Sequence, residues 1–98
     1  MLLINELPIE VTKIYPSSSF KGLEILFRIE NYDYHFLIGK STKPFPLNVK
    51  HIFKEKDVCP FCQKNIYAAP LGQQICLEFQ KNLPILLKYF QKKYPDIF

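Results

Sequence analysis

Apolar side chains recur at every second position in two runs between residues 22 and 38, and this pattern most limits what the chain can fold into. Every second residue is apolar on both sides of a short polar break: Leu23, Ile25, Phe27 and Ile29 before it, and Tyr34, Phe36 and Ile38 after it. A period of two is what a half-buried β-strand requires. Because Asn31-Tyr32-Asp33 supplies turn residues between the two runs, we predict a β-hairpin.

A third strand is predicted before the hairpin. Residues 9–15 are bounded by Pro8 and Pro16. Proline cannot donate a hydrogen bond to a neighbouring strand, so prolines at both ends are typical of an edge strand. Residues 1–39 are therefore expected to form a small three-stranded antiparallel sheet.

The pattern changes after Gly39. Residues 40–46 contain Pro44 and Pro46 and predict a loop, and Asn48 can cap a short helix with Val49, Ile52 and Phe53 as its apolar stripe. Residues 58–72 have no clear period. From Gln73 onward a helical period returns, and Pro84 either kinks this helix or starts a second one that begins at Asn82.

These elements predict one α+β domain over residues 1–98. It combines a β-rich part (1–39), a segment with a loop, a short helix and the cysteines (40–72), and a helical C-terminus (73–98) packed against the sheet. The 98 residues are 48% hydrophobic, 15% aromatic and 22% charged, which excludes the disordered class. No run approaches the roughly 18 apolar residues of a membrane span, and the N-terminus lacks the basic region of a signal peptide, so we expect a cytoplasmic protein without a membrane partner.

The cysteines indicate a metal site. Cys59 and Cys62 form a CxxC pair, and Cys76 and His51 lie close to it in the sequence. Zinc binds four sulfur or nitrogen donors in a tetrahedron, and a CxxC turn supplies two of them. Cys59-Pro60-Phe61-Cys62, followed by Lys64 and Ile66, resembles the knuckle of zinc ribbons and treble-clef fingers. Those families supply a second close ligand pair, whereas here Cys76 and His51 would complete a zinc knuckle between the sheet and the helices.

Two other interpretations use the same atoms. Cys-Pro-Phe-Cys also resembles the Cys-Pro-Tyr-Cys motif of glutaredoxins, which implies a thiol oxidoreductase. That motif follows a strand of an α/β fold and opens a helix, whereas Pro70 and Gly72 would break a helix starting at Cys62. Alternatively, all three thiols are reduced and inert, with Cys76 in the core and His51 exposed on a basic helix.

The charge is unevenly divided along the chain. Residues 1–36 carry three basic and five acidic side chains, and residues 37–98 carry ten lysines and four acids. This asymmetry favours an anionic partner for the C-terminal half. Because twelve of the thirteen basic residues are lysines, nucleic-acid binding would be non-specific and salt-sensitive. The candidate binding residues are Lys50, Lys54, Lys56, Phe61, Lys64, Lys81, Lys88, Lys92 and Lys93, among them an aromatic side chain beside cations.

No set of catalytic residues accompanies these features. Gly39-Lys40-Ser41-Thr42 imitates the end of a P-loop, but Tyr34 stands where the motif needs its first glycine, so no nucleotide cofactor is expected. The sequence favours a small non-catalytic binding module that binds nucleic acid, or that acts as an accessory subunit or inhibitor of a nucleic-acid-processing protein. The alternative is a protein-interaction module, for which pairing at a sheet edge would also permit a homodimer. The many Lys, Ile, Asn, Phe and Tyr residues fit an AT-rich coding sequence, such as that of a phage or another mobile element.

Overall fold

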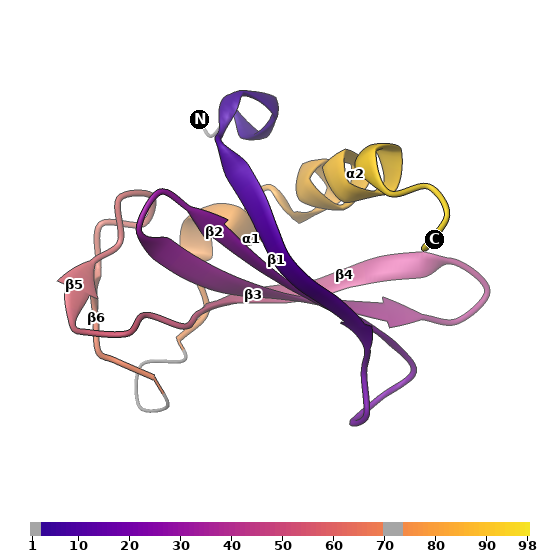
Figure 1. The fold of residues 1–98 in the computed structure, drawn as a ribbon, viewed down its shortest axis with the longest axis horizontal. Coiled ribbons are helices and arrows are strands. Elements are labelled where there is room, and N and C mark those ends of the chain that lie inside the picture. The colour runs from indigo at the N-terminus through magenta and orange to yellow at the C-terminus, as the bar shows by residue number, and fades with distance from the viewer. Residues whose placement is uncertain (1–2, 70–73) are drawn as a thin grey trace.

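The computed structural model describes residues 3–69 and 74–98, and its central element is a four-stranded antiparallel sheet (Figure 1). The strands follow one another in the order β1-β2-β3-β4: β1 (Ile9–Pro16), β2 (Gly22–Ile29), β3 (Tyr32–Lys40) and β4 (Pro44–His51). A short 3-10 helix, η1 (Ile4–Glu6), precedes β1. The predicted α+β class is confirmed, but the predicted number of strands was wrong, because the sheet has four strands and not three.

The predicted hairpin and the predicted edge strand are both present. In the β2–β3 hairpin, Phe27 lies opposite Tyr34 and Ile29 opposite Tyr32, so Glu30 and Asn31 form the connection. Glu30 takes a positive φ of 57°, which a two-residue hairpin connection requires. The strand β1 pairs only with β2 and therefore lies at the edge of the sheet.

The fourth strand, β4, replaces the predicted loop and short helix. Val49 lies opposite Phe36 and His51 lies opposite Tyr34, so these β4 side chains share the core face of the sheet. The apolar residues Phe45, Leu47 and Val49 have a period of two, which the prolines and the expected Asn48 cap obscured. Both prolines are accommodated because β4 is the last strand of the sheet and its pairing register shifts beside Pro46, between Leu37 and Ile38.

The remaining elements are a small hairpin and two helices. The hairpin consists of β5 (Asp57–Val58) and β6 (Asn65–Ile66), and the helices are α1 (Leu77–Gln80) and α2 (Leu83–Lys93). Pro84 stands in the first turn of α2, so the second of the two predicted arrangements, a new helix beginning after Asn82, is the one observed. The predicted break at Pro70 and Gly72 and the predicted helix start at Gln73 lie outside the described residues.

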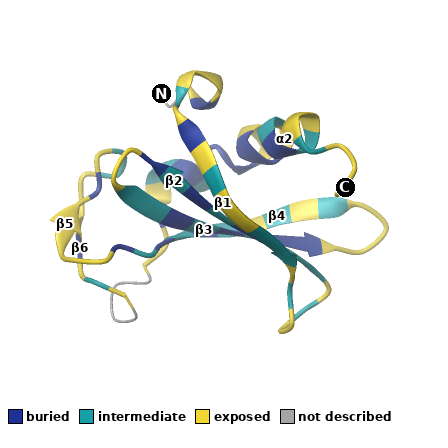
Figure 2. Cartoon of the chain, in the orientation of Figure 1, coloured by how far each residue is buried: buried dark blue, intermediate teal, exposed yellow. Residues whose placement is uncertain are grey.

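The core lies between one face of the sheet and the two helices, and Figure 2 colours the chain by how far each residue is buried. It is rich in aromatic rings: the Phe27 and Phe90 ring centroids are 5.6 Å apart, and those of Tyr34 and Phe79 are 5.2 Å apart. After α2 the chain returns to the sheet, where Phe98 packs against the core and Ile97 is more exposed. None of the helices in the described part of the chain has the length and apolar character needed to cross a membrane.

Candidate metal centre

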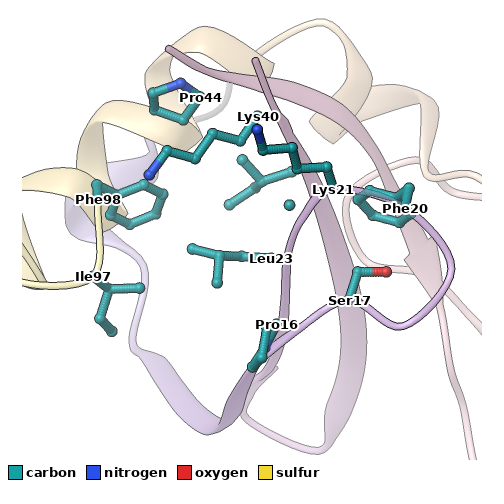
Figure 3. Close-up of a pocket in the computed structure, with 11 residues that line it drawn as sticks. Pro16, Ser17, Phe20, Lys21, Leu23, Lys40, Pro44, Ile97 and Phe98 are labelled. Atoms are coloured by element: carbon teal, nitrogen blue, oxygen red, sulfur yellow. The ribbon is translucent and has the colours of Figure 1, made fainter. Parts of the chain in front are cut away.

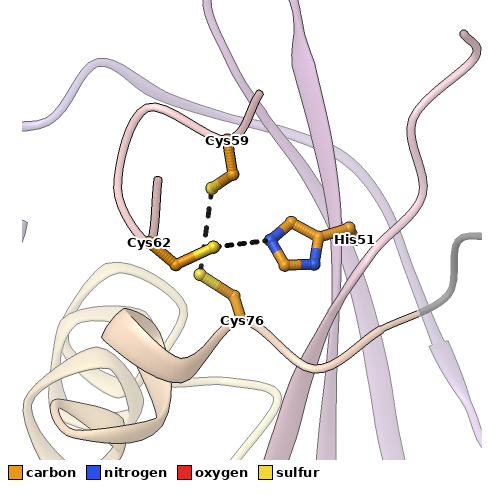
Figure 4. A group of neighbouring side chains, drawn as sticks. All are labelled: His51, Cys59, Cys62 and Cys76. Carbon is orange, nitrogen blue, oxygen red and sulfur yellow. Dashed lines mark hydrogen bonds between the residues drawn. The ribbon is translucent and has the colours of Figure 1, made fainter. Parts of the chain in front are cut away.

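The four predicted ligands come together at the β5–β6 end of the molecule (Figures 1 and 4). His51 ends β4, Cys59 and Cys62 lie in the connection between β5 and β6, and Cys76 directly precedes α1. The four ligand atoms all lie within 4.8 Å of one another. Residues that are up to 25 positions apart in the sequence therefore form one compact group that can hold a metal ion.

The connection between β5 and β6 is a tight turn that directs two sulfurs to the same point. The Cys59 N–H donates to the Lys64 carbonyl at 3.0 Å, and the Gln63 N–H donates to the Cys59 carbonyl at 2.9 Å. Gln63 has a positive φ of 63°, which lets the chain reverse and pair Val58 with Asn65. This turn is the local structure that the CxxC spacing predicts.

His51 is oriented by the segment that approaches β4 from the other side. Its backbone N–H donates to the Gln74 carbonyl at 2.9 Å, and its side-chain Nδ1 lies 2.6 Å from the same oxygen. Because a carbonyl only accepts hydrogen bonds, this contact places the proton on Nδ1 and leaves Nε2 free as a ligand atom. Nε2 lies 3.5 Å from the Cys62 sulfur. The alternative of an exposed histidine on a basic helix was wrong, since His51 is fully buried on a strand.

Cys76 is placed by the same segment. Its N–H donates to the Val49 carbonyl at 2.8 Å, and Ile75 pairs with Lys50 as an isolated β-bridge. This pairing brings the Cys76 sulfur to 4.0 Å from that of Cys59. The two ligands that the CxxC turn lacks therefore come from two neighbouring chain segments, and not from a second close pair.

Hydrogen bonds converge on the sulfurs. Backbone N–H groups of Cys62, Lys64 and Phe79 donate to the sulfurs of Cys59, Cys62 and Cys76, respectively. The Tyr34 hydroxyl lies 3.3 Å from the Cys59 sulfur. Such donors stabilise thiolate charge away from water, and a thiolate is the form of cysteine that binds metals.

The pKa values of the three thiols respond to burial and to one another. The hydrogen bond between Cys76 and Cys59 lowers the pKa of Cys59, and the same bond raises the pKa of Cys76. Burial raises the pKa of Cys62. Burial is also the first reason why the pKa of Tyr34 is raised, so its hydroxyl keeps its proton and can donate it to sulfur.

The centre is enclosed by protein. His51, Cys59 and Cys76 have no exposed surface, and Cys62 is half-buried. The CxxC pair lies in a β-hairpin connection and not at the start of a helix, which is the position that activates a redox thiol in glutaredoxin-like motifs. Three of the four ligand residues are therefore shielded from solvent, and Cys62 is the most exposed of them.

The predicted partner-binding residues do not form one group. Lys54, Lys56 and Lys64 are exposed around the β5–β6 hairpin, and Lys50 is half-buried on the sheet. Lys81, Lys88, Lys92 and Lys93 are all exposed on or beside the helices. Figure 1 shows α2 and the β5–β6 hairpin toward opposite ends of the molecule.

Phe61 is not an exposed aromatic platform. Its ring is half-buried, with its centroid 5.3 Å from that of Phe79 and 6.0 Å from that of Tyr34. Two residues that orient the centre were missed by the sequence analysis. Tyr34 was assigned to the core through its alternation, and Gln74 contributes through its backbone carbonyl, which no residue type reveals.

Comparison with known proteins gives no further guide to the centre. No protein-family model, no curated protein and no solved structure matches the chain.

Proposed function

We propose that the protein is a non-catalytic binding module that is stabilised by one zinc ion, held by His51, Cys59, Cys62 and Cys76, and that contacts nucleic acid through the lysines of its helical C-terminus. The observation that carries the zinc assignment is the geometry of the four ligand atoms. In a zinc tetrahedron with Zn–S bonds of about 2.3 Å and a Zn–N bond of about 2.0 Å, sulfurs are about 3.8 Å apart, and sulfur and nitrogen about 3.5 Å apart. The Cys59–Cys76 sulfur separation is 4.0 Å, and the Cys62 sulfur lies 3.5 Å from His51 Nε2.

The chemistry of the donors also favours zinc over other common ions. Three sulfurs and one imidazole are soft or borderline donors, whereas calcium and magnesium require oxygen ligands. All four positions of the tetrahedron would be filled by protein side chains, which is typical of structural zinc sites, while catalytic sites keep one position for water. The ion would thus fix the fold and take no part in a reaction.

The zinc assignment is tested by metal analysis of the purified protein. We expect one equivalent of zinc per chain, and less than half an equivalent would contradict the assignment. The His51→Ala and Cys76→Ser variants should each bind zinc more weakly in competition with a chromogenic chelator. The Lys64→Ala variant changes the same loop without removing a side-chain ligand, so it should match the wild type.

The nucleic-acid part of the proposal is supported by the charge on the helices. Lys88, Lys92 and Lys93 are exposed, and within the described part of the chain none of them forms an ion pair. Lys81 lies only 3.9 Å from Glu78, in a pair too exposed to neutralise the surface. Unpaired lysines along one helix can follow a phosphate backbone without reading its sequence.

Fluorescence anisotropy with a labelled oligonucleotide tests this contact. We expect binding at low salt that weakens steeply as salt rises, and that is largely lost in the Lys88→Gln, Lys92→Gln, Lys93→Gln triple variant. The matched control carries Lys13→Gln, Lys40→Gln and Lys43→Gln, which remove the same charge elsewhere on the surface. No binding at low salt, or equal loss in both triple variants, would contradict the proposed contact.

A protein-interaction module remains the second candidate function, because apolar side chains are exposed on neighbouring elements. Leu47 on β4 is 37% exposed and Leu77 on α1 is 48% exposed, and the Gln80 side chain of α1 donates to the Leu47 carbonyl. If an accessory or inhibitory role is correct, a tagged protein should recover the same nucleic-acid enzyme from lysate with and without nuclease. Recovery that disappears with nuclease would instead assign the binding to nucleic acid.

A further inference from the structure

A pocket of about 330 Å³ lies at the end of the sheet away from the candidate metal centre. Leu23 and Ile38, which pair across β2 and β3, both line it and form what we call its apolar floor. Phe20 and Phe98 lie on opposite sides of Leu23 (Figure 3). Its volume is at the lower end of the range of roughly 300–1,000 Å³ that is typical of small-molecule sites. The pocket therefore has the size of a small-molecule site, and many of the side chains that line it are apolar.

Two lysine side chains give the edge of this pocket a positive charge. Lys21 and Lys40 both line it and are both exposed, and the Lys40 N–H donates to the Lys21 carbonyl at 2.9 Å, so the two residues are fixed side by side. Figure 3 shows both side chains along the same side of the pocket. No acidic side chain is among the described lining residues, and neither lysine forms an ion pair within residues 3–69 and 74–98.

The backbone beneath the lysines keeps the pocket in shape. Gly22 and Gly39 lie opposite each other on β2 and β3, directly next to the two lysines. A Cβ on Gly39 would lie 2.5 Å from the Phe45 ring, and one on Gly22 would lie 2.0 Å from the Ile38 carbonyl oxygen. Gly22 therefore has no room for a side chain, and one at Gly39 would displace the Phe45 ring, so the two strands pack closely at the point where the lysines leave them.

We propose that this pocket binds an organic anion with an apolar body and a single acidic head, such as a medium-chain or aromatic carboxylate. The body would lie on Leu23 and Ile38, and the carboxylate would be held between the ammonium groups of Lys21 and Lys40. Burial of the ligand's apolar body would supply affinity without fixing its orientation. The two lysines would select ligands with a negative head and would fix where that head lies. The site uses none of the residues of the candidate metal centre or of helix α2, so it is independent of the proposed function.

Titration of the isotope-labelled protein, as purified, with decanoate below its micelle concentration tests the site by amide chemical shifts. We expect shifts confined to residues 20–23, 38–44 and 97–98, and affinity that decreases as salt rises. Decyltrimethylammonium has the same chain with the opposite charge and should not produce these shifts. Shifts spread over the exposed apolar residues of β4 and α1, or equal binding of the two detergents, would overturn the proposal.

A pair of double variants assigns the role of the lysines. Lys21→Gln with Lys40→Gln should weaken decanoate binding about tenfold, because two partly exposed charge contacts are lost. Lys54→Gln with Lys64→Gln removes the same charge at the other end of the molecule and should leave decanoate affinity unchanged. All four positions are exposed, so both variants are expected to fold, which circular dichroism checks. Equal affinity of the two double variants for decanoate would overturn the proposal.

Discussion

At the scale of single residues, the hydroxyl of Tyr34 is the contact that ties the candidate metal centre to the core. Its ring is fully buried and stacks with Phe27 at 5.5 Å, while its oxygen lies 3.3 Å from the Cys59 sulfur. The Tyr34 ring therefore packs in the core while its hydroxyl makes a polar contact with a predicted ligand. Because a thiolate that binds zinc keeps excess negative charge, a hydrogen-bond donor beside it strengthens metal binding.

The substitution Tyr34→Phe removes that donor and keeps the ring. We expect zinc affinity to fall by about 10- to 100-fold, as is typical when a hydrogen bond to a ligand is lost. Competition with a chromogenic chelator measures this change. Tyr32→Phe on the same strand is the control, since Tyr32 packs against Phe53 and, within the described residues, its hydroxyl makes no hydrogen bond to a ligand sulfur. Unchanged affinity of Tyr34→Phe would show that the hydroxyl does not act on the metal.

Glu24 is the buried charge on the other face of the sheet, and it gives a pH-dependent prediction. Although burial raises the pKa of its carboxyl, hydrogen bonds from Ser17, Tyr15 and His35 together lower it below the ordinary value of 4.5. A lowered pKa in the folded protein stabilises the fold above the ordinary value, and this stabilisation is lost as the pH falls through the lowered pKa. Glu24→Gln should therefore lower the free energy of unfolding by about 1 kcal/mol at neutral pH. The difference in this free energy between variant and wild type should shrink below pH 4.5.

Urea unfolding at a series of pH values measures that difference. Release of the proposed zinc ion in acid would affect wild type and variant alike, so the comparison between them isolates Glu24. The control is Glu55→Gln, which alters an exposed loop carboxylate and should change the free energy of unfolding by less than about 0.5 kcal/mol. A difference between wild type and Glu24→Gln that grows as the pH falls would contradict the assigned direction of the pKa.

At the scale of elements, three strands of the four-stranded sheet follow from the sequence, whereas β4 does not. The β2–β3 hairpin and β1 follow from alternation and bounding prolines. The strand β4 was missed because Pro44 and Pro46 are typical of loops, and because Val49, Ile52 and Phe53 also fit a helical stripe. The ligand identities of the candidate site followed from residue types and spacing. Its outer contacts did not, because the carbonyl of Gln74 reaches His51 only through the pairing of distant segments.

Helix α2 offers a direct test of which helix face is buried. Leu86 is fully buried against the sheet, whereas its neighbour Ile85 is 46% exposed. Leu86→Ala should lower the free energy of unfolding by about 2–5 kcal/mol, because it removes buried apolar surface and leaves a cavity. Ile85→Ala should change it by about 0.5 kcal/mol or less. Urea unfolding distinguishes the two, and equal effects would mean that the packing of α2 on the sheet is wrong.

At the scale of the whole molecule, the candidate metal centre joins the small β5–β6 hairpin to the sheet and to the start of α1. The strands β5 and β6 contain only two residues each, and a hairpin of that size is not stable alone in water. The two cysteines in the connection between these strands lie beside His51 of the sheet and Cys76, which directly precedes α1. The ring of Phe79 on α1 contacts both Tyr34 of β3 and Phe61 of the CxxC turn. A change at the centre is therefore transmitted directly into the aromatic core.

Removal of zinc should for this reason destabilise the entire protein and not only one loop. The binding free energy of a structural zinc ion, on the order of 10 kcal/mol or more, is comparable with the total stability of a small domain, because the site does not exist in the unfolded chain. We expect a strong chelator under reducing conditions to lower the melting temperature and to abolish the cooperative transition seen by circular dichroism. Added zinc should restore that transition, whereas added magnesium should not, since magnesium requires oxygen ligands. A melting curve that is unchanged by complete zinc removal would contradict this prediction and would show that the sheet and α2 are stable without the centre.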